Sequence, residues 1–262
     1  MEILICVKEV PDETVEIHLD PASMQPDLSR ASAQANAFDS YALEMAARYV
    51  EANGGSITLI SLGKSDTVAT LRNCIAVGAT KAYAVIDPAL DGADSTAIAK
   101  VLKSAIAKLE EESGKKFDLI LTGKESTDYV GGEFGGILAE VLALPEIGNV
   151  VSFEETSNGI KAKKELESGY AETETSLPAV FTISTPGYSP RYPTIKSKMA
   201  ARKVAVPVYS LADLGLDVPA SKVEFSEYID PPKRTAGEKI IDLSPEDAVA
   251  YMMKKLTEAK AL

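Results

Sequence analysis

Short, unbroken apolar runs alternate with amphipathic segments along most of the chain. The run at residues 3–7 is typical of a strand buried on both faces of a parallel sheet. Further runs predict strands at residues 57–62, 81–86 and 117–121, and extended segments at 150–153, 160–164 and 179–183, with a turn near Gly169. Helical spacing predicts helices at residues 40–50, 67–77, 94–112 and 134–144. This alternation predicts an α/β fold with right-handed βαβ units and a doubly wound, mostly parallel sheet.

The character of the chain changes after residue 202. Residues 230–237 are polar and irregular, and a helix is expected to begin at Ser244. This part has too little apolar surface to form a core of its own. The sequence therefore predicts an α/β domain over residues 1–202 and, over residues 203–262, an extended C-terminal arm that packs on another subunit.

Composition narrows the possible functions. The chain has 262 residues and a formal net charge of −12, which would repel the phosphate backbone of a nucleic acid. The densest basic stretch, at residues 196–203, is too short to offset this charge, so a nucleic acid is disfavoured as a partner. No apolar run reaches transmembrane length and no leader-like segment stands at the start, so we expect a cytoplasmic protein without membrane insertion. Cys6 and Cys74 lie in apolar runs typical of buried thiols. The single histidine, His18, disfavours a transition-metal site, so redox chemistry would need a cofactor.

Three segments follow predicted strand ends, where open α/β sheets bind their ligands. They are residues 8–12, 62–66 and 123–136. The third is rich in glycine and leads into a helix, so its backbone can approach a ligand closely and the free N–H groups of the helix favour an anion. It is neither a Walker loop nor a GxGxxG fingerprint, and a purely structural turn is the alternative interpretation.

Several polar and apolar residues near these segments have simpler interpretations. Asn36 or Asp39 could cap the helix that follows them, and Lys124 could be an ordinary surface charge. Tyr192 and Ile195 lie in a proline-interrupted segment, where exposed apolar side chains would indicate a docking surface. The alternative for these two residues is that they cover the edge of the domain.

Six stretches of the chain, in the same order, resemble motifs of the β subunits of electron-transfer flavoproteins. They are residues 7–12 (VKEVPD), 36–46 (NAFDSYALEMA), 77–82 (VGATKA), 123–128 (GKESTD), 190–203 (PRYPTIKSKMAARK) and 230–237 (DPPKRTAG). The resemblance implies an adenine-nucleotide-binding α/β fold of the Rossmann-like or adenine-nucleotide α-hydrolase-like kind. It also implies a heterodimer with an α subunit that holds the electron-carrying FAD and is wrapped by the arm of this chain.

Carried over by position, the resemblance implies two sets of functional residues. The nucleotide would lie against Cys6, Asn36, Ala37, Phe38, Asp39, Leu62, Gly123, Lys124, Glu125, Ser126, Thr127, Asp128, Tyr129, Val130, Gly131, Gly132, Glu133 and Phe134. Residues 188–200 correspond to the segment that docks to acyl-CoA or other flavin dehydrogenases. Its docking side chains are Arg191, Tyr192, Ile195 and Met199, with Ile195 as the apolar anchor. No catalytic or metal-ligating residue is expected.

The chain departs from the family pattern where it would bind its ligand. Ala37 replaces a proline, residues 125–127 replace Gln-Ala-Ile, residues 130–136 lack the usual glutamine, and residues 167–172 are a weakened acidic-glycine signature. In one version of the family the β subunit holds AMP as a structural ligand. In the other it holds a second FAD, which takes hydride from NADH and divides the electrons between a high-potential and a low-potential acceptor, with ferredoxin or flavodoxin as candidate acceptors.

Of these two ligands, FAD is preferred. Gly131, Gly132, Gly135 and Gly136 leave room for a pyrophosphate beside the backbone. Beyond Lys124, the loop has no basic side chain that would fix a single terminal phosphate.

Two other classes of function fit the sequence less well. A non-redox regulatory module that binds an adenine nucleotide would need neither the arm nor the docking segment. An adenylate-forming or ATP-splitting enzyme would carry a Ser/Gly phosphate loop after its first strand, where residues 8–12 contain no glycine.

Overall fold

The computed structural model describes residues 1–223, 226–230, 232 and 236–261. The described residues form two compact units, Met1–Tyr228 and Ile229–Leu262. The first unit continues past residue 202, where the sequence predicts the arm to begin, because the short strand β11 (Val208–Tyr209) pairs with the sheet and Leu211 is buried.

The second unit contains α6 (Pro245–Glu258), which begins at the predicted cap, because the side chain of Ser244 accepts a hydrogen bond from the N–H of Asp247. The motif at residues 230–237 falls only partly on described residues. Its members Pro231, Lys233, Arg234 and Thr235 lie outside them.

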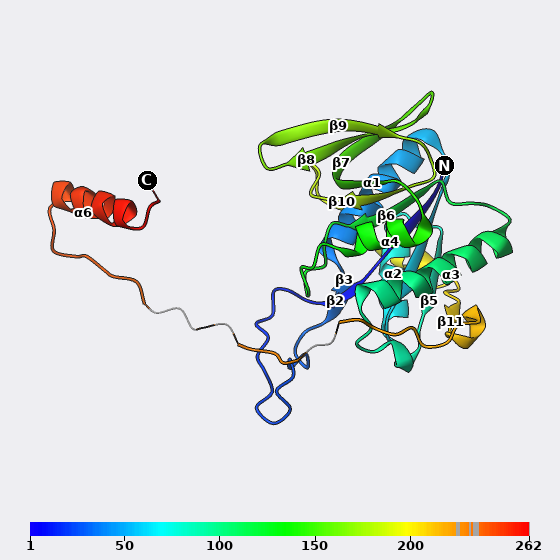
Figure 1. The fold of residues 1–262 in the computed structure, drawn as a ribbon, viewed down its shortest axis with the longest axis horizontal. Coiled ribbons are helices and arrows are strands. Elements are labelled where there is room, and N and C mark those ends of the chain that lie inside the picture. Colours follow the sequence, from blue (N-terminus) through cyan, green and yellow to red (C-terminus); the bar gives the residue numbers. More distant parts are fainter. Residues whose placement is uncertain (224–225, 231, 233–235, 262) are drawn as a thin grey trace. The chain divides into compact units, whose positions relative to one another are not determined.

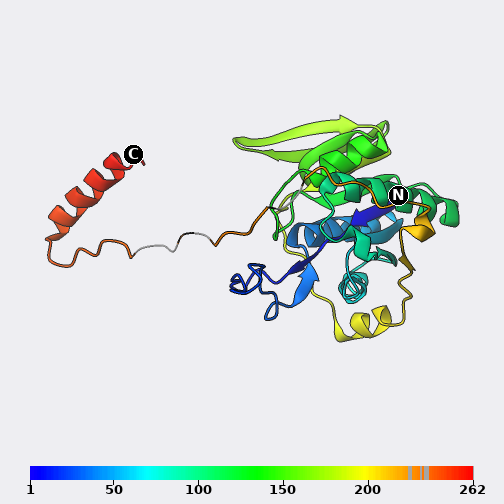
Figure 2. The same ribbon diagram turned by 60° about the horizontal axis from the view of Figure 1, so that its bottom comes forward.

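Among its described residues, Met1–Tyr228 forms a nine-stranded sheet in the order β11-β5-β4-β1-β6-β10-β7-β8-β9 (Figure 1). All pairs from β11 to β7 are parallel, whereas β8 and β9 extend the sheet in antiparallel fashion, as the green strands of Figure 2 show. The bounds are β1 Glu2–Cys6, β4 Ser56–Leu62, β5 Lys81–Val85, β6 Leu119–Gly123, β7 Glu146–Thr156, β8 Gly159–Leu166, β9 Gly169–Thr175 and β10 Ala179–Ile183. The predicted α/β fold with a doubly wound, mostly parallel sheet is confirmed.

Helices cover both faces of this sheet (Figure 1). One face packs against α1 (Ala37–Asn53) and α2 (Thr67–Ile75), and the other against α3 (Ser95–Ser113) and α4 (Phe134–Leu142). Each face of the sheet has its own hydrophobic core, and alternate residues of β1 belong to the two cores. Ile3 and Ile5 lie in the core under α1 and α2, and Leu4 and Cys6 lie in the core under α3 and α4. Burial on both faces explains why the apolar run at residues 3–7 is unbroken.

Several parts of the described chain differ from the predictions. The turn predicted near Gly169 is present at residues 167–168, but the strand that follows it, β9, is not predicted, because most of its side chains are exposed and it lacks an apolar alternation. The proline-interrupted segment contains α5 (Ile195–Ala201), which begins with a capping box between Thr194 and Ser197. α1 begins earlier than predicted, at Ala37.

A small antiparallel pair brings the chain back to the end of β1. It consists of β2 (Glu9–Pro11) and β3 (Ala33–Ala35). After it, the N–H of Asn36 donates to the carbonyl oxygen of Lys8 over 2.9 Å. The first turn of α1 therefore lies beside the carboxyl end of β1.

Both cysteines are buried free thiols, as the sequence predicts. Within the described ranges, none of the helices combines the length and the apolar character that crossing a membrane requires.

Candidate functional site

A cleft opens at the carboxyl ends of β1 and β6. In the chain, β1 is followed by β4 on one side and later by β6 on the other, so the order of the sheet reverses between β1 and β6. Open α/β sheets bind ligands at such a point. The cleft is lined by the ends of β1, β4 and β6, by the starts of α1, α3 and α4, and by the loop at residues 123–134.

Most of the predicted nucleotide-binding residues line this cleft. They are Cys6, Asn36, Asp39, Leu62, Gly123, Lys124, Glu125, Ser126, Tyr129, Gly131, Gly132, Glu133 and Phe134. The predicted residues that lie outside its lining are Ala37, Phe38, Thr127, Asp128 and Val130. The lining also includes residues outside the predicted nucleotide-binding set, of which Lys8 lies in the predicted strand-end segment 8–12 and the others are Val7, Ile60, Ser95, Ile98, Leu102 and Thr122. Because most of these end a strand or begin α3, the strand-end rule could have found several of them.

Asp39 ties the ends of two strands together from the first turn of α1. Its buried carboxylate accepts hydrogen bonds from the N–H of Lys8, after β1, over 2.7 Å and from the N–H of Gly123, at the end of β6, over 2.8 Å. Burial raises the pKa of Asp39 to about 6, although both N–H groups favour the charged form. Asp39 is therefore a carboxylate at neutral pH and takes up a proton as the pH falls towards its pKa.

Asn36 holds the loop that follows β6. Its Nδ2 donates to the carbonyl oxygen of Glu125 over 2.9 Å, and its Oδ1 accepts from the N–H of Thr127 over 3.1 Å. Asn36 makes no side-chain capping bond to α1, and Asp39 bonds to the strand ends instead, so the capping interpretation of these two residues is wrong. The four hydrogen bonds made by the side chains of Asn36 and Asp39 are called the α1 latch below.

The loop passes so close to the α1 latch that it requires glycine at its first position. A Cβ on Gly123 would lie 2.6 Å from Oδ1 of Asp39 and 2.6 Å from the Cβ of Phe38. Farther along the loop, Val130 and Gly132 have φ angles of 55° and 65°. A β-branched residue is strained in this region, and such strain tends to concentrate at binding sites.

Charged side chains at the rim fasten the loop. Lys8 Nζ donates to Asp128 Oδ1 over 2.8 Å and to Ser126 Oγ over 3.2 Å. Lys124 Nζ lies 4.9 Å from the ring centroid of Phe38. The two lysines therefore bring positive charge to a loop that also carries carboxylates.

The starts of two helices meet at the cleft. Ser95 Oγ, in the first turn of α3, donates to Oε1 of Glu133, the N-cap residue of α4, over 2.8 Å. The start of α3 is capped by the carboxylate of Asp94, whereas no side chain caps α4, so the N–H groups and the dipole of α4 favour an anion at this place.

Apolar side chains form the other wall of the cleft: Ile60, Leu62, Ile98, Leu102 and Phe134. Such a wall suits a flat ring system. Burial raises the pKa of the Cys6 thiol in the same lining, and the nearby carboxylate of Asp39 adds to this effect. Cys6 therefore remains a neutral thiol, which is a poor nucleophile.

Comparison with known proteins agrees with this geometry. A family model for the electron transfer flavoprotein domain matches residues 27–214. The electron transfer flavoprotein subunit beta of Megasphaera elsdenii is 32% identical to the chain over 271 residues, which cover 100% of both proteins. The chain belongs to the electron transfer flavoprotein β-subunit family. This membership supports electron transfer as its function and implies an α-subunit partner and association with flavin or AMP.

The matches to two further relatives also cover most of the length of those proteins. The electron transfer flavoprotein subunit beta of Thermoanaerobacterium thermosaccharolyticum is 34% identical over 218 residues, covering 83% of this chain and 81% of that protein. The caffeyl-CoA reductase-Etf complex subunit CarD of Acetobacterium woodii is 28% identical over 264 residues, covering 98% of each.

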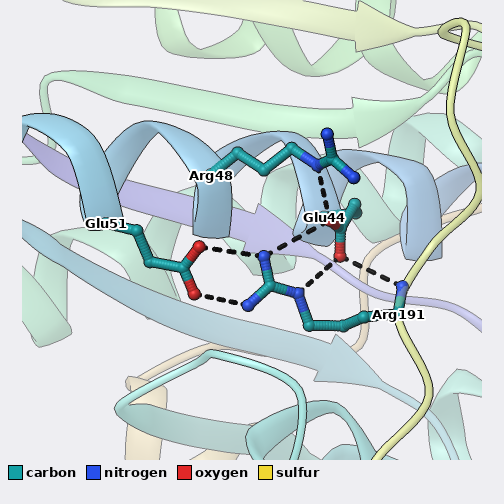
Figure 3. Close-up of polar contacts among 4 residues, drawn as sticks. All are labelled: Glu44, Arg48, Glu51 and Arg191. Carbon is teal, nitrogen blue, oxygen red and sulfur yellow. Dashed lines mark hydrogen bonds and ion pairs between the residues drawn. The ribbon is translucent and has the colours of Figure 1, made fainter.

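In this β-subunit chain, the predicted docking residues fall into two kinds. Tyr192, Ile195 and Met199 are 92%, 82% and 61% exposed, and Ile195 and Met199 lie one turn apart on α5. The side chain of Arg191 instead turns to α1, where it forms ion pairs with Glu44 and Glu51 (Figure 3). The exposed apolar side chains thus directly follow an arginine whose guanidinium group is paired with two glutamates of the same chain.

The close packing of Gly123 predicts a difference between two glycine-to-alanine substitutions. Gly123→Ala should lower the free energy of unfolding by about 1–3 kcal/mol, because the added methyl group overpacks the α1 latch. Gly136→Ala is the control, since a Cβ there has no neighbour within 4 Å and the residue lies in α4. It should be neutral or stabilising by up to about 1 kcal/mol. Urea unfolding of both variants measures the effect, and equal stabilities would contradict the packing described.

The raised pKa of Asp39 predicts a pH-dependent difference between the wild type and Asp39→Asn. Between the unfolded value of 3.8 and the folded value of about 6, the folded state binds more protons at Asp39 than the unfolded state. The stability that this group contributes is therefore present at the acidic end and is lost as the pH rises through about 6. Relative to Asp39→Asn, the wild type should lose at most about 3 kcal/mol across this window. Chemical unfolding at several pH values tests this, and a constant difference would argue against the shift.

Proposed function

We propose that this chain is the nucleotide-binding half of an electron-transferring heterodimer, with FAD as the preferred ligand of the cleft at the ends of β1 and β6. The observation that carries the proposal is the α1 latch, which fastens a glycine-containing loop at the point where the order of the sheet reverses. A fastened backbone next to the uncapped N-terminus of α4 is a preorganised site for phosphate groups.

The residues present fit an adenine nucleotide. The wall formed by Ile60, Leu62 and Leu102 suits the adenine ring, and the uncapped N–H groups at the start of α4 suit phosphate oxygens. Carboxylates in the lining can accept hydrogen bonds from ribose hydroxyls, as acidic residues do in other dinucleotide sites.

FAD is favoured over AMP by the loop. At Gly132 the backbone carries no side chain that would keep a pyrophosphate away, and the strained φ of Val130 lies close by. The ring of Tyr129 packs against Gly131, and Gly135 and Gly136 lie outside the lining of the cleft, so these three glycines do not add to the argument. FAD, when bound, supplies the chemistry of accepting hydride from NADH and releasing electrons one at a time. The chain itself contributes binding, orientation and exclusion of water, since Cys6 remains a neutral thiol.

A division of electrons between two acceptors follows if this chain holds a flavin of its own in addition to that of the α subunit. One electron would pass to a high-potential acceptor and the other to a low-potential carrier such as ferredoxin or flavodoxin. A structural AMP is the second candidate, because its adenine ring and ribose would meet the same apolar wall and carboxylates of the cleft as those of FAD.

The arm and the docking segment extend the proposal to partners. In α6 the side chains of Val249, Met252 and Met253 are exposed, so this helix presents an apolar face that suits burial against the α subunit. Tyr192, Ile195 and Met199 suit brief apolar contact with a flavin dehydrogenase. The name of the Acetobacterium woodii relative places that protein in a complex with a CoA-ester reductase, which supports an acyl-CoA dehydrogenase as the partner here.

The ligand is tested on this chain co-expressed with its α subunit, by denaturing the heterodimer and counting the released FAD and AMP. The expected result is a second FAD and no AMP, and Asn36→Ala should lose this second FAD selectively because it breaks two bonds of the α1 latch. A single FAD with one AMP would make the nucleotide structural and leave the electron traffic to the partner. A single FAD with no AMP would overturn the nucleotide site.

The docking role is tested by Ile195→Asp. A buried carboxylate at an apolar contact is costly, so delivery of electrons between the heterodimer and an acyl-CoA dehydrogenase should fall at least about tenfold. The content of bound nucleotide should not change, because Ile195 lies outside the cleft. Leu28→Asp, on the loop between β2 and β3, is the control at an exposed apolar residue outside the docking segment. Undiminished delivery with Ile195→Asp would rule out docking through this segment.

A further inference from the structure

A glutamate is buried in the middle of α1, outside the lining of the cleft described above. The side chain of Glu44 is 2% exposed and has apolar, buried neighbours in the helix. A carboxylate in such a position is stable only if hydrogen bonds and opposite charges replace its water.

Glu44 obtains these partners from two arginines (Figure 3). Arg48 Nε donates to Oε1 over 2.6 Å from the next turn of the helix. Arg191 donates to Oε2 twice, from its backbone N–H over 3.1 Å and from Nε over 2.8 Å. Burial raises the pKa of Glu44, but the hydrogen bonds from Arg191 and Arg48 outweigh it, so the pKa lies below its ordinary value and the group is ionised at neutral pH.

Arg191 directs its whole guanidinium group at α1. Nη1 donates to Glu51 Oε1, Nη2 donates to Glu51 Oε2 over 3.0 Å, and Nη2 also lies 3.3 Å from Glu44 Oε1. Each of its three guanidinium nitrogens thus has a carboxylate partner on the same helix. The forked geometry is one that arginine can satisfy and lysine cannot.

A second contact fixes the chain just before Arg191. The guanidinium of Arg48 lies 4.0 Å from the ring centroid of Tyr188, which is a cation–π contact. The backbone at residues 188–191 is therefore held against α1 at both ends. Tyr192 follows directly, and α5, with Ile195 and Met199, begins after the capping box at Thr194.

We infer that Glu44 and Arg191 form a clasp that positions the docking segment, and that Arg191 acts through this clasp and not by touching the dehydrogenase. The inference rests on the proposed docking function of residues 188–200. Exposed apolar side chains on a free loop would have to be ordered when the partner binds, which weakens the association. The clasp orders the segment in advance, so the exposed apolar side chains meet the dehydrogenase from a fixed backbone.

The test is a double-mutant cycle in the α–β heterodimer, with Glu44→Gln, Arg191→Gln and the double variant. An acyl-CoA dehydrogenase, reduced with its own acyl-CoA, is the probe, and reduction of the heterodimer flavin gives KM and kcat. Each single variant should raise the KM for the heterodimer by about tenfold with little change in kcat, and the double variant should raise it no further than the larger single effect. Additive effects would show that Arg191 contacts the dehydrogenase directly and would overturn the inference.

A second readout does not depend on the dehydrogenase. Hydrogen exchange of the amides at residues 188–199, measured on the heterodimer alone, should speed up at least about tenfold in each single variant because the segment is released from α1. Unchanged exchange would overturn the clasp. If Ile195→Asp leaves electron delivery intact, the docking function fails, whereas faster exchange in the clasp variants would still show that Glu44 orders the segment.

Two further variants keep the test decisive. Glu51→Gln alters an exposed partner of the same arginine, so it is expected to fold even if Glu44→Gln does not. It should give a smaller rise in KM that disappears in the Arg191→Gln background, and additivity would again count against the clasp. Glu111→Gln, on the exposed side of α3, is the matched control for loss of one surface carboxylate and should change neither readout.

Discussion

Two buried carboxylates on α1 are the constraint on which the cleft and the exposed apolar segment both depend. A carboxylate that is removed from water has to find donors or cations within the protein. Asp39 finds them at the ends of β1 and β6, and Glu44 finds them on Arg48 and Arg191. Because both belong to one helix packed on the sheet, the loop at residues 123–134 and the segment at residues 188–191 are held by the same rigid element.

The two carboxylates are stabilised by different partners, and their pKa values move in opposite directions. Asp39 receives peptide N–H groups, which do not offset burial, and its pKa rises to about 6. Glu44 receives two guanidinium groups, and its pKa is lowered. Hydrogen bonds from a charged donor are stronger than those from a peptide, so they compensate for the loss of water more fully. As the pH falls, Asp39 in the cleft is therefore protonated before Glu44, which holds residues 188–191.

The sequence predicts the centre of this fold better than its margins, and burial explains why. β1 and its parallel neighbours are covered on both faces, so their apolar runs are unbroken. β9 lies at an edge with most side chains exposed, and the short helix α5 depends on its capping box rather than on an apolar period. In the cleft, the strand-end rule and the family resemblance locate the loop. Ile98 and Leu102 escaped prediction because their spacing on α3 is explained by core packing alone.

Glu44 shows what a sequence can and cannot indicate about a polar contact. It lies within a stretch of α1 where Ala42, Leu43, Met45 and Ala46 are buried, and a glutamate is rarely buried unless it is paired. That pattern indicates that a partner exists, but not which of the 27 lysines and arginines it is. Arg191 is 147 positions away, and it reaches Glu44 because β10 lies beside β6 and delivers the following residues to the side of the sheet that α1 covers. The identity of the pair is thus a property of the sheet order, which local sequence patterns do not contain.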